Sequence, residues 1–214
     1  GGGKTTAASL IPRFWDVDSG RVTVGGADVR ELDSAALMER VAFVFQDTRL
    51  FKESLLENIR AARPDASRDE VLAAAHAAQC DDILEKLPQG LDTVVGARGV
   101  YLSGGEQQRI ALARAILKDA PIVVLDEATA FADPENEHQI QKAFETLTRN
   151  KTVLMIAHRL STVQNADSII VLNEGKIAEQ GSHSALLEKN GVYAAMWADY
   201  QRSAQWKVGK EAAV

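Results

Sequence analysis

The order of apolar and polar positions along the chain predicts several short buried strands. Continuous runs of β-branched and other apolar residues, bounded by polar residues, are typical of strands in sheets that are covered on both faces. Such runs occur at Val41–Phe45, Ile122–Leu125, Thr152–Ala157 and Ser168–Leu172. All are far shorter than the roughly 18 residues that a membrane-spanning helix requires. We therefore expect that this chain does not itself cross a membrane.

Between these runs the apolar positions recur every three to four residues, which indicates amphipathic helices. The clearest helix is predicted over Asp69–Leu87, within an Ala-rich helical region that extends from Leu55 to about Lys118. Further helices are predicted over Lys4–Arg13, near Glu135–Thr148 and over Ser184–Gln205.

Two segments with glycine turns, Gly20–Val29 and Asn173–Ser182, predict hairpins. The whole pattern indicates one α/β domain over residues 1–214 with a helical insertion. We expect an α/β core formed by residues 1–53 and 119–183, a helical subdomain over 54–118 and a C-terminal helical segment over 184–214. The end of that segment, from Met196 to Gly209, either packs back on the domain or meets a partner.

Composition and charge exclude some functions. The net charge is −6 and the isoelectric point is about 5.3, which argues against broad nucleic-acid binding, since that usually needs a basic surface. Cys80 is the only cysteine, so an internal disulfide is impossible, and we interpret it as a packing residue. His76, His138 and His183 show no metal-ligand spacing with it.

The chain begins with the sequence GGGKTT, which matches the end of a phosphate-binding loop of the form G-x-x-x-x-G-K-[ST]. Such a loop holds phosphate oxygens with backbone N–H groups, while its Lys neutralises phosphate charge and its hydroxyl reaches Mg²⁺. The first glycine of the pattern would lie before Gly1. The match is therefore partial, and a flexible glycine-rich terminus is the alternative. The candidate phosphate-binding residues are Gly1, Gly2, Gly3, Lys4, Thr5 and Thr6.

Two carboxylates follow the apolar run in Pro121–Thr129. A buried strand that ends in Asp126 and Glu127 delivers both to the carboxyl edge of a sheet, where α/β proteins bind ligands. Asp126 is the candidate ligand of Mg²⁺, and Glu127 is the candidate general base for an attacking water. The alternative is that the two acids cap the helix that follows.

Between these two halves lies Tyr101–Leu117, with the sequence YLSGGEQQRIALARAIL. Here the sequence resembles the nucleotide-binding domain of ATP-binding cassette (ABC) transporters, over essentially the whole chain. The resemblance implies a P-loop NTPase core, which is a mostly parallel sheet flanked by helices, with an inserted α-helical subdomain. It also implies that Ser103, Gly104 and Gly105 form a signature turn that contacts the γ-phosphate of ATP bound by a second domain.

Other positions match the family in order. Gln46 resembles the glutamine that contacts Mg²⁺ and the attacking water. With Thr5 of the phosphate-binding loop and Asp126, it completes the set of candidate metal ligands. His158 resembles the histidine that touches the γ-phosphate, and Ala130–Asp133 resembles the loop that crosses the dimer interface. The alternatives are that Gln46 only ends its strand and that His158 is structural.

The loops before the signature and after Gln46 are similar to those of exporter-type domains. The resemblance implies an ATPase that powers transport, a transmembrane domain fused upstream, and a second nucleotide-binding domain in a head-to-tail dimer. It places the domain at the cytoplasmic face of the plasma membrane, with ATP and Mg²⁺ as cofactors and no nucleic acid. The sequence GGGKTT is then the end of a truncated phosphate loop.

Two positions depart from the family pattern. Glu106 replaces the usual signature Gln, where it either adds negative charge near the partner's phosphates or points into the helix. Ala97 stands where exporters usually carry Glu. Glu106, with Lys118–Glu137, is similar to a subgroup linked to siderophore and iron transport, although drug and lipid substrates also stay open.

Two other functions are not excluded at this point. One is a soluble ABC ATPase that acts in DNA repair or on ribosomes, against which the acidic isoelectric point and the exporter-like loops weigh. The other is a degenerate domain that binds ATP only to regulate a partner, against which Glu127 and His158 weigh.

Overall fold

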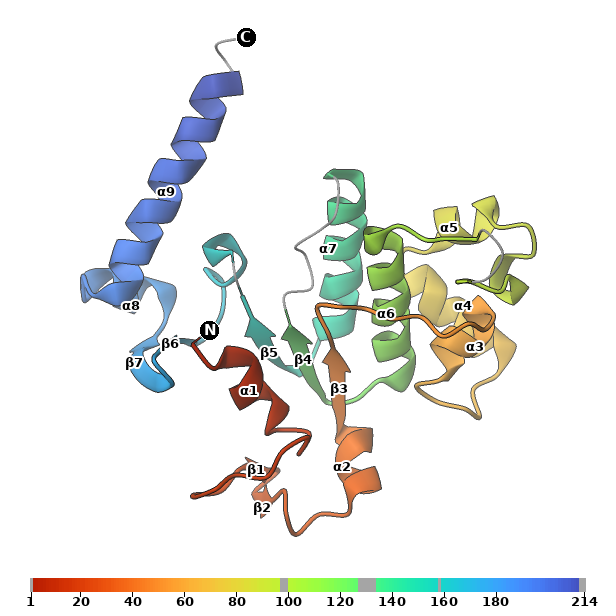
Figure 1. Cartoon of the computed structure of the whole chain (residues 1–214), viewed down its shortest axis with the longest axis horizontal. Coiled ribbons are helices and arrows are strands. Elements are labelled where there is room, and N and C mark those ends of the chain that lie inside the picture. Colours follow the sequence, from red (N-terminus) through yellow and green to blue (C-terminus); the bar gives the residue numbers. More distant parts are fainter. Residues whose placement is uncertain (1, 97–99, 127–133, 158, 212–214) are drawn as a thin grey trace. The chain divides into compact units, whose positions relative to one another are not determined.

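The computed structural model describes residues 2–96, 100–126, 134–157 and 159–211 (Figure 1). The chain forms two compact units. The larger unit consists of Ala8–Met155, and the smaller unit combines Gly1–Ala7 with Ile156–Val214.

The centre of the larger unit is a three-stranded sheet in the order β3–β4–β5. Its strands are β3 (Val41–Val44), β4 (Ile122–Asp126) and β5 (Thr152–Ile156). β3 and β4 are parallel, with Val44 opposite Leu125, and all three arrows point the same way in Figure 1. The apolar runs therefore form strands as predicted, and β4 is almost completely buried because it lies between the other two.

The helical insertion packs on the long helix α6 (Gly104–Lys118). It contains α3 (Leu55–Arg60), α4 (Arg68–Ala77), α5 (Asp81–Lys86) and the short 3₁₀ turn η1 (Gly90–Asp92). α6 also packs against β3 and against α7 (Pro134–Thr148), so one hydrophobic core joins the insertion to the sheet. Leu55, Ile59, Val71, Ile83 and Ile110 are fully buried in this core.

The prediction of one long helix over Asp69–Leu87 is wrong, because two helices, α4 and α5, occupy this segment. α4 ends at Ala77, and Gln79 then has a left-handed backbone with a φ of 60°. A residue in this conformation ends a helix by turning the chain away from the axis. Cys80 is fully buried after this turn, and burial raises the pKa of its thiol to about 12, which confirms its interpretation as a packing residue.

The helix predicted over Lys4–Arg13 is also shorter, since α1 spans Lys4–Ser9. Pro12 lacks the N–H that would continue the helix, and Arg13 adopts a φ of 58°. The predicted hairpin follows, with β1 (Thr23–Val24) antiparallel to β2 (Ala27–Asp28). A helix that the sequence pattern did not reveal, α2 (Ser34–Arg40), begins after the capping side chain of Asp33.

The smaller unit contains a second predicted hairpin, formed by β6 (Ile169–Asn173) and β7 (Lys176–Gly181). It is preceded by the 3₁₀ turn η2 (Leu160–Thr162). The helix predicted over Ser184–Gln205 is instead α8 (His183–Glu188) and α9 (Val192–Glu211), because Asn190 is left-handed with a φ of 50°. Ile169, Val171, Leu186 and Tyr193 form the core of this unit.

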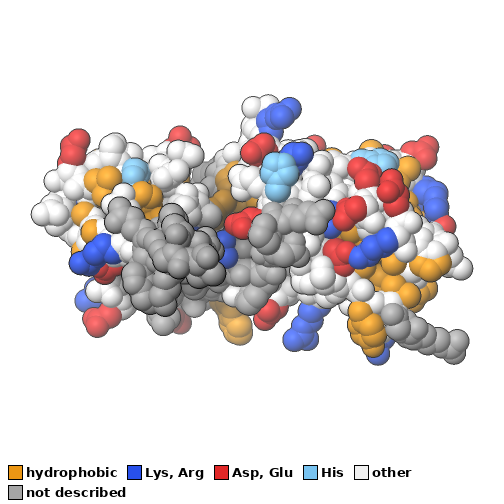
Figure 2. Space-filling model, turned by 90° about the horizontal axis from the view of Figure 1, so that it is seen from above, with side chains coloured by type: hydrophobic (Ala, Val, Ile, Leu, Met, Phe, Trp, Pro, Cys, Tyr) orange, Lys and Arg blue, Asp and Glu red, His pale blue; other side chains and the backbone are white. Residues whose placement is uncertain are grey.

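Figure 2 shows one face of the molecule, on which Lys and Arg side chains lie among Asp and Glu side chains. Within the part of the chain that the structure describes, no helix combines the length and apolar character that a membrane crossing requires.

Candidate functional site

Two of the candidate residues lie at the carboxyl edge of the parallel sheet. Asp126 is the last residue of β4 and is 6% exposed. Gln46 is exposed and follows β3 by two residues. Because Val44 pairs with Leu125 in parallel register, both residues lie at the carboxyl ends of their strands, at the same edge of the sheet. Ligands of open α/β sheets bind at this edge.

The glycine-rich segment of the smaller unit leads directly into α1. Gly3 has a φ of 81°, a conformation that favours glycine, and its carbonyl accepts the N–H of Ala7 at 2.9 Å. Lys4 is therefore the first helical residue, as the end of a phosphate-binding loop requires. Lys4 is partly exposed, and Thr5 and Thr6 are exposed.

The signature segment forms a capped helix N-terminus in the larger unit. Ser103 is the N-cap of α6, and its Oγ accepts the backbone N–H of Glu106 at 3.3 Å. The carboxylate of Glu106 accepts the backbone N–H of Ser103 at 2.7 Å, which completes a capping box. Ser103 and Gly104 are exposed. The N–H groups of Gly104 and Gly105 have no acceptor within the helix, because they belong to its first turn.

Gly105 is needed for close packing of α6 on α7. A Cβ atom at this position would lie 2.9 Å from the Cβ and Cγ atoms of Asn136. A larger residue would therefore push the two helices or the Asn136 side chain apart. Gly105 thus fixes where the start of α6 lies.

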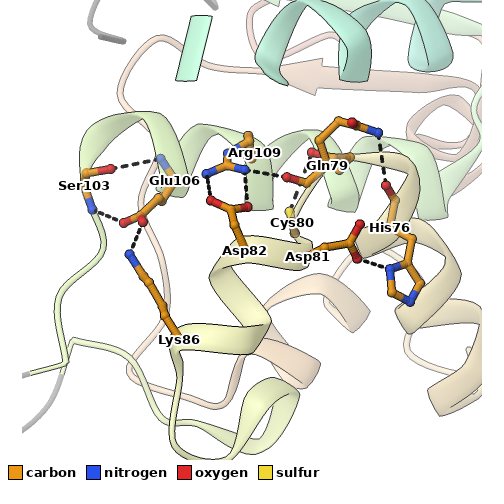
Figure 3. A network of polar contacts seen from close by, with 10 residues as sticks. His76, Gln79, Cys80, Asp81, Asp82, Lys86, Ser103, Glu106 and Arg109 are labelled. Atoms are coloured by element: carbon orange, nitrogen blue, oxygen red, sulfur yellow. Dashed lines mark hydrogen bonds and ion pairs between the residues drawn. The ribbon is translucent and has the colours of Figure 1, made fainter. Parts of the chain in front are cut away.

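The structure decides between the two alternatives for Glu106. Its side chain points back to the helix start, where it is held by Ser103 and by the ammonium group of Lys86 on α5 (Figure 3). The residue is 8% exposed. Burial by itself raises the pKa of Glu106, but the hydrogen bonds from Lys86 and Ser103 outweigh it, and the net pKa is lowered. Glu106 is thus an ionised part of the turn.

A second ion pair joins the same two helices. The Arg109 guanidinium, whose side chain is 2% exposed, contacts both carboxylate oxygens of Asp82 at 2.6 and 2.8 Å (Figure 3). It also donates to the carbonyl of Gln79. Burial lowers the pKa of Arg109, but the pair with Asp82 more than offsets this, so that Arg109 stays charged.

The loop after Gln46 is fastened to the helical insertion by Asn58, which is fully buried on α3. Its Oδ1 accepts the N–H of Phe51 at 2.8 Å, and its Nδ2 donates to the carbonyls of Phe51, Glu53 and Ser54. Arg114 of α6 donates to Oδ1 of Asn58 at 2.6 Å and to the carbonyl of Arg49 at 3.0 Å. The helix that begins at the signature is therefore hydrogen-bonded to the loop that begins at Gln46.

We expect Asn58→Ala to loosen this loop. The change leaves the N–H and C=O groups of Phe51 without the side chain that pairs with them. Each such loss costs about 1–3 kcal/mol. It also removes one acceptor of Arg114, which keeps its hydrogen bonds to the backbone carbonyls of residues 58 and 49. Hydrogen exchange of peptides covering residues 46–60 in the full-length protein should accelerate by about tenfold or more. Gln141→Ala, on the exposed face of α7, is the control and should leave these rates unchanged. Unchanged exchange in Asn58→Ala would contradict the proposed anchoring.

Several predicted residues fall outside the described part of the chain. These are Gly1, Glu127, His158, the segment Ala130–Asp133 and Ala97. Conversely, sequence reasoning missed Lys86, Asn58, Arg109 and Arg114. None of these four residues stands in a local sequence pattern that indicates its role. The capping role of Glu106, in contrast, has a local signal, because Ser-x-x-Glu before an apolar-periodic helix is the pattern of a capping box.

Comparison with known proteins identifies the family. Residues 1–130 match the family model described as ABC transporter. The chain is 50% identical over 197 residues to the ATP-dependent lipid A-core flippase of Legionella pneumophila strain Paris, covering 92% of this chain and 34% of that protein. It is 50% identical over 204 residues to the mycobactin import ATP-binding/permease protein IrtA of Mycolicibacterium smegmatis, covering 95% of this chain and 24% of that protein.

A solved structure agrees with the sequence matches. The fold is similar to that of a bacterial Atm1-family ABC exporter with ATP bound, with a TM-score of 0.85 and 44% identity. The similarity covers 92% of this chain and 35% of the exporter. The chain belongs to the ABC transporter family and has the P-loop NTPase fold of its nucleotide-binding domains, as the sequence predicted. It spans about a third of the flippase and about a quarter of IrtA.

Proposed function

We propose that this chain is the ATP-binding and ATP-hydrolysing domain of an exporter-type ABC transporter. The observation that carries the proposal is the order and form of three phosphate-binding elements. A glycine turn leads into Lys4, a capped helix N-terminus presents Ser103, and a buried strand ends at Asp126. An isolated glycine turn or helix cap is common, but the three together, in this order, favour a nucleotide site.

The proposed roles follow from the side-chain chemistry. Gly1, Gly2, Gly3, Thr6 and Lys4 hold the phosphates of ATP, with Lys4 neutralising their charge. Glu127 accepts a proton from the attacking water, and Gln46 and His158 position that water and the γ-phosphate. Ser103, Gly104 and Gly105 bind the γ-phosphate of the ATP held by a second nucleotide-binding domain.

Mg²⁺ fits the residues proposed to hold it. Asp126 offers a buried carboxylate, and Thr5 and Gln46 offer neutral oxygens, which are the ligands that Mg²⁺ prefers. Among the described residues no group of three or more His, Cys, Asp or Glu side chains forms a metal site, and Mg²⁺ bound with phosphates needs only one or two carboxylates. When bound, Mg²⁺ would neutralise charge on the β- and γ-phosphates.

The proposed assembly contains two such domains and a membrane part. We place a transmembrane domain upstream in the full protein and pair this domain head to tail with a second one, at the cytoplasmic face of the plasma membrane. The relatives that are three to four times longer support this arrangement. Within the domain, residues 1–53 and 119–183 would form the ATP-binding core, 54–118 the signature subdomain and 184–214 the C-terminal segment.

The transported substrate is proposed only as a class. One set of relatives is named for lipid A-core flipping and another for mycobactin import, so a lipid or a siderophore is favoured. Glu106 in the signature also resembles the siderophore-linked subgroup. The resemblance to exporter-type domains leaves a drug as the third possible class of substrate.

The test is an ATPase assay on the full-length protein in lipid nanodiscs. We expect phosphate release from ATP that requires Mg²⁺ and stops when EDTA is added. We also expect a fluorescent ATP analogue to bind. Absence of both binding and hydrolysis would overturn the proposal, and binding without hydrolysis would favour the regulatory alternative.

A further inference from the structure

The carboxylate of Glu106 has both oxygens engaged within the chain. Oε2 accepts the backbone N–H of Ser103 at 2.7 Å, and Oε1 contacts Nζ of Lys86 (Figure 3). The Glu106 side chain is 10% exposed, whereas that of Lys86 is 48% exposed. A half-exposed ammonium group thus covers a nearly buried carboxylate at the start of α6.

This arrangement answers an electrostatic problem in the proposed signature turn. The first turn of a helix attracts anions through its N–H groups and the positive end of the helix dipole. A carboxylate in that turn stabilises the helix, but it also weakens the attraction for a phosphate nearby. A Gln at this position would cap the helix without charge. The Glu of this chain therefore needs a nearby cation if the turn is to bind phosphate.

The position of Lys86 is fixed by the second ion pair between the same helices. Asp82 and Lys86 are separated by one helical turn on α5, and Glu106 and Arg109 are separated by one turn on α6. Asp82 of α5 pairs with the buried Arg109 of α6, and Lys86 of α5 pairs with Glu106 of α6. Each helix thus contributes the acid to one pair and the base to the other. The Asp82–Arg109 pair holds α5 against α6 and thereby presents Lys86 to Glu106 (Figure 3).

We propose that Lys86 is a positioning residue for ATP binding, which neutralises Glu106 and keeps the Ser103–Gly105 turn suited to a phosphate. The inference rests on the proposed function, because it assumes that this turn contacts ATP. Lys86 acts through Glu106 and not through contact with the nucleotide. This role of Lys86 depends on the negative charge of Glu106. A neutral Gln at position 106 would carry no charge for Lys86 to compensate.

The test is a double-mutant cycle on the full-length protein in nanodiscs. The variants are Lys86→Met, Glu106→Gln and the double variant, and each is assayed for the KM and kcat of ATP hydrolysis. Lys86→Met exposes the turn to an uncompensated negative charge, so we expect the KM for ATP to rise about fivefold at low salt, with less change in kcat. In the Glu106→Gln background the same change should alter KM by less than about twofold, because no charge is left to compensate.

Salt and a matched lysine provide the controls. The rise in KM should shrink at about 0.5 M salt, because ions screen the repulsion between Glu106 and phosphate. Lys151→Met removes another lysine ion pair, with Asp119 at the opposite end of α6, and should leave KM unchanged. Thermal unfolding of all variants shows whether they fold.

The double-mutant cycle distinguishes a positioning role of Lys86 from a purely structural one. The proposal is supported if Lys86→Met raises KM in the protein that keeps Glu106 but not in the Glu106→Gln variant. An equal KM rise in both backgrounds, or none in either, overturns it and leaves Lys86 with only a structural role. If the wild-type protein in the same preparation neither binds nor hydrolyses ATP, the proposed function itself fails, and the two failures are thereby distinguished.

Discussion

Glu127→Gln in the full-length protein is expected to lower kcat for ATP hydrolysis by about 10²–10⁴-fold while ATP still binds. The amide has nearly the shape of the carboxylate, so the site keeps its packing, but it accepts no proton at neutral pH. General-base catalysis contributes a factor of this size when the base is lost. Phosphate release under single-turnover conditions measures the chemical step, and a fluorescent ATP analogue measures binding.

A matched substitution separates this effect from a general loss of charge. Glu145→Gln makes the same chemical change on the exposed face of α7 and should leave kcat unchanged. Near-normal hydrolysis in Glu127→Gln would remove Glu127 from the role of base. Loss of ATP binding together with hydrolysis would instead indicate that the residue mainly organises the site.

Asp82→Ala is expected to lower the free energy of unfolding by about 2–4 kcal/mol, the largest effect on stability that we predict. The change leaves the guanidinium of Arg109, whose side chain is 2% exposed, with only the carbonyl of Gln79 as partner. Removing one member of a pair whose other charge is buried is costly, because the remaining charge stays desolvated. Pulse proteolysis of the full-length protein in urea measures the change.

The control is another bidentate pair of the same residue types. Asp92 contacts Arg68 at 2.8 and 2.7 Å, but the Arg68 side chain is 53% exposed. Asp92→Ala should therefore cost no more than about 1 kcal/mol, as exposed ion pairs do. Equal losses for the two variants would show that burial of the arginine does not determine the effect.

The Asp82–Arg109 pair also predicts a direction of pH dependence. The hydrogen bond from Arg109 lowers the pKa of Asp82 below its ordinary value. The stabilisation by this pair is therefore fully present above about pH 4, the ordinary value for Asp, and is lost as the pH falls through the lower pKa of the folded state. The difference in stability between the wild type and Asp82→Ala should thus narrow only in acid.

Sequence alone predicts the elements whose signal is local. The apolar runs at Val41–Phe45 and Ile122–Leu125 contain neighbouring parallel strands, as expected because continuous apolar runs are typical of strands in parallel sheets. The glycine turn before Lys4 is likewise predicted, since the left-handed backbone at Gly3 favours glycine. The order of the motifs then indicates the family without any coordinates.

Helix ends are determined less well by the sequence. The apolar periodicity of Asp69–Leu87 continues through Gln79, although the helix does not. Gln79 carries no local sign of a left-handed conformation, because glycine or asparagine is the usual residue there. The break places Asp82 and Lys86 on a separate helix, α5, which faces α6.

Only the tertiary structure decides what the charged residues do. The sequence leaves Glu106 either directed at phosphate or turned into its helix, and the contacts with Ser103 and Lys86 select the second. Arg109 and Asn58 look like ordinary polar residues in the sequence, yet both are buried. Arg109 holds α5, and Asn58 holds the loop after Gln46. The reason is physical: periodicity and turn chemistry are properties of neighbouring residues, whereas the compensation of a buried charge depends on partners about 20 to 30 positions away.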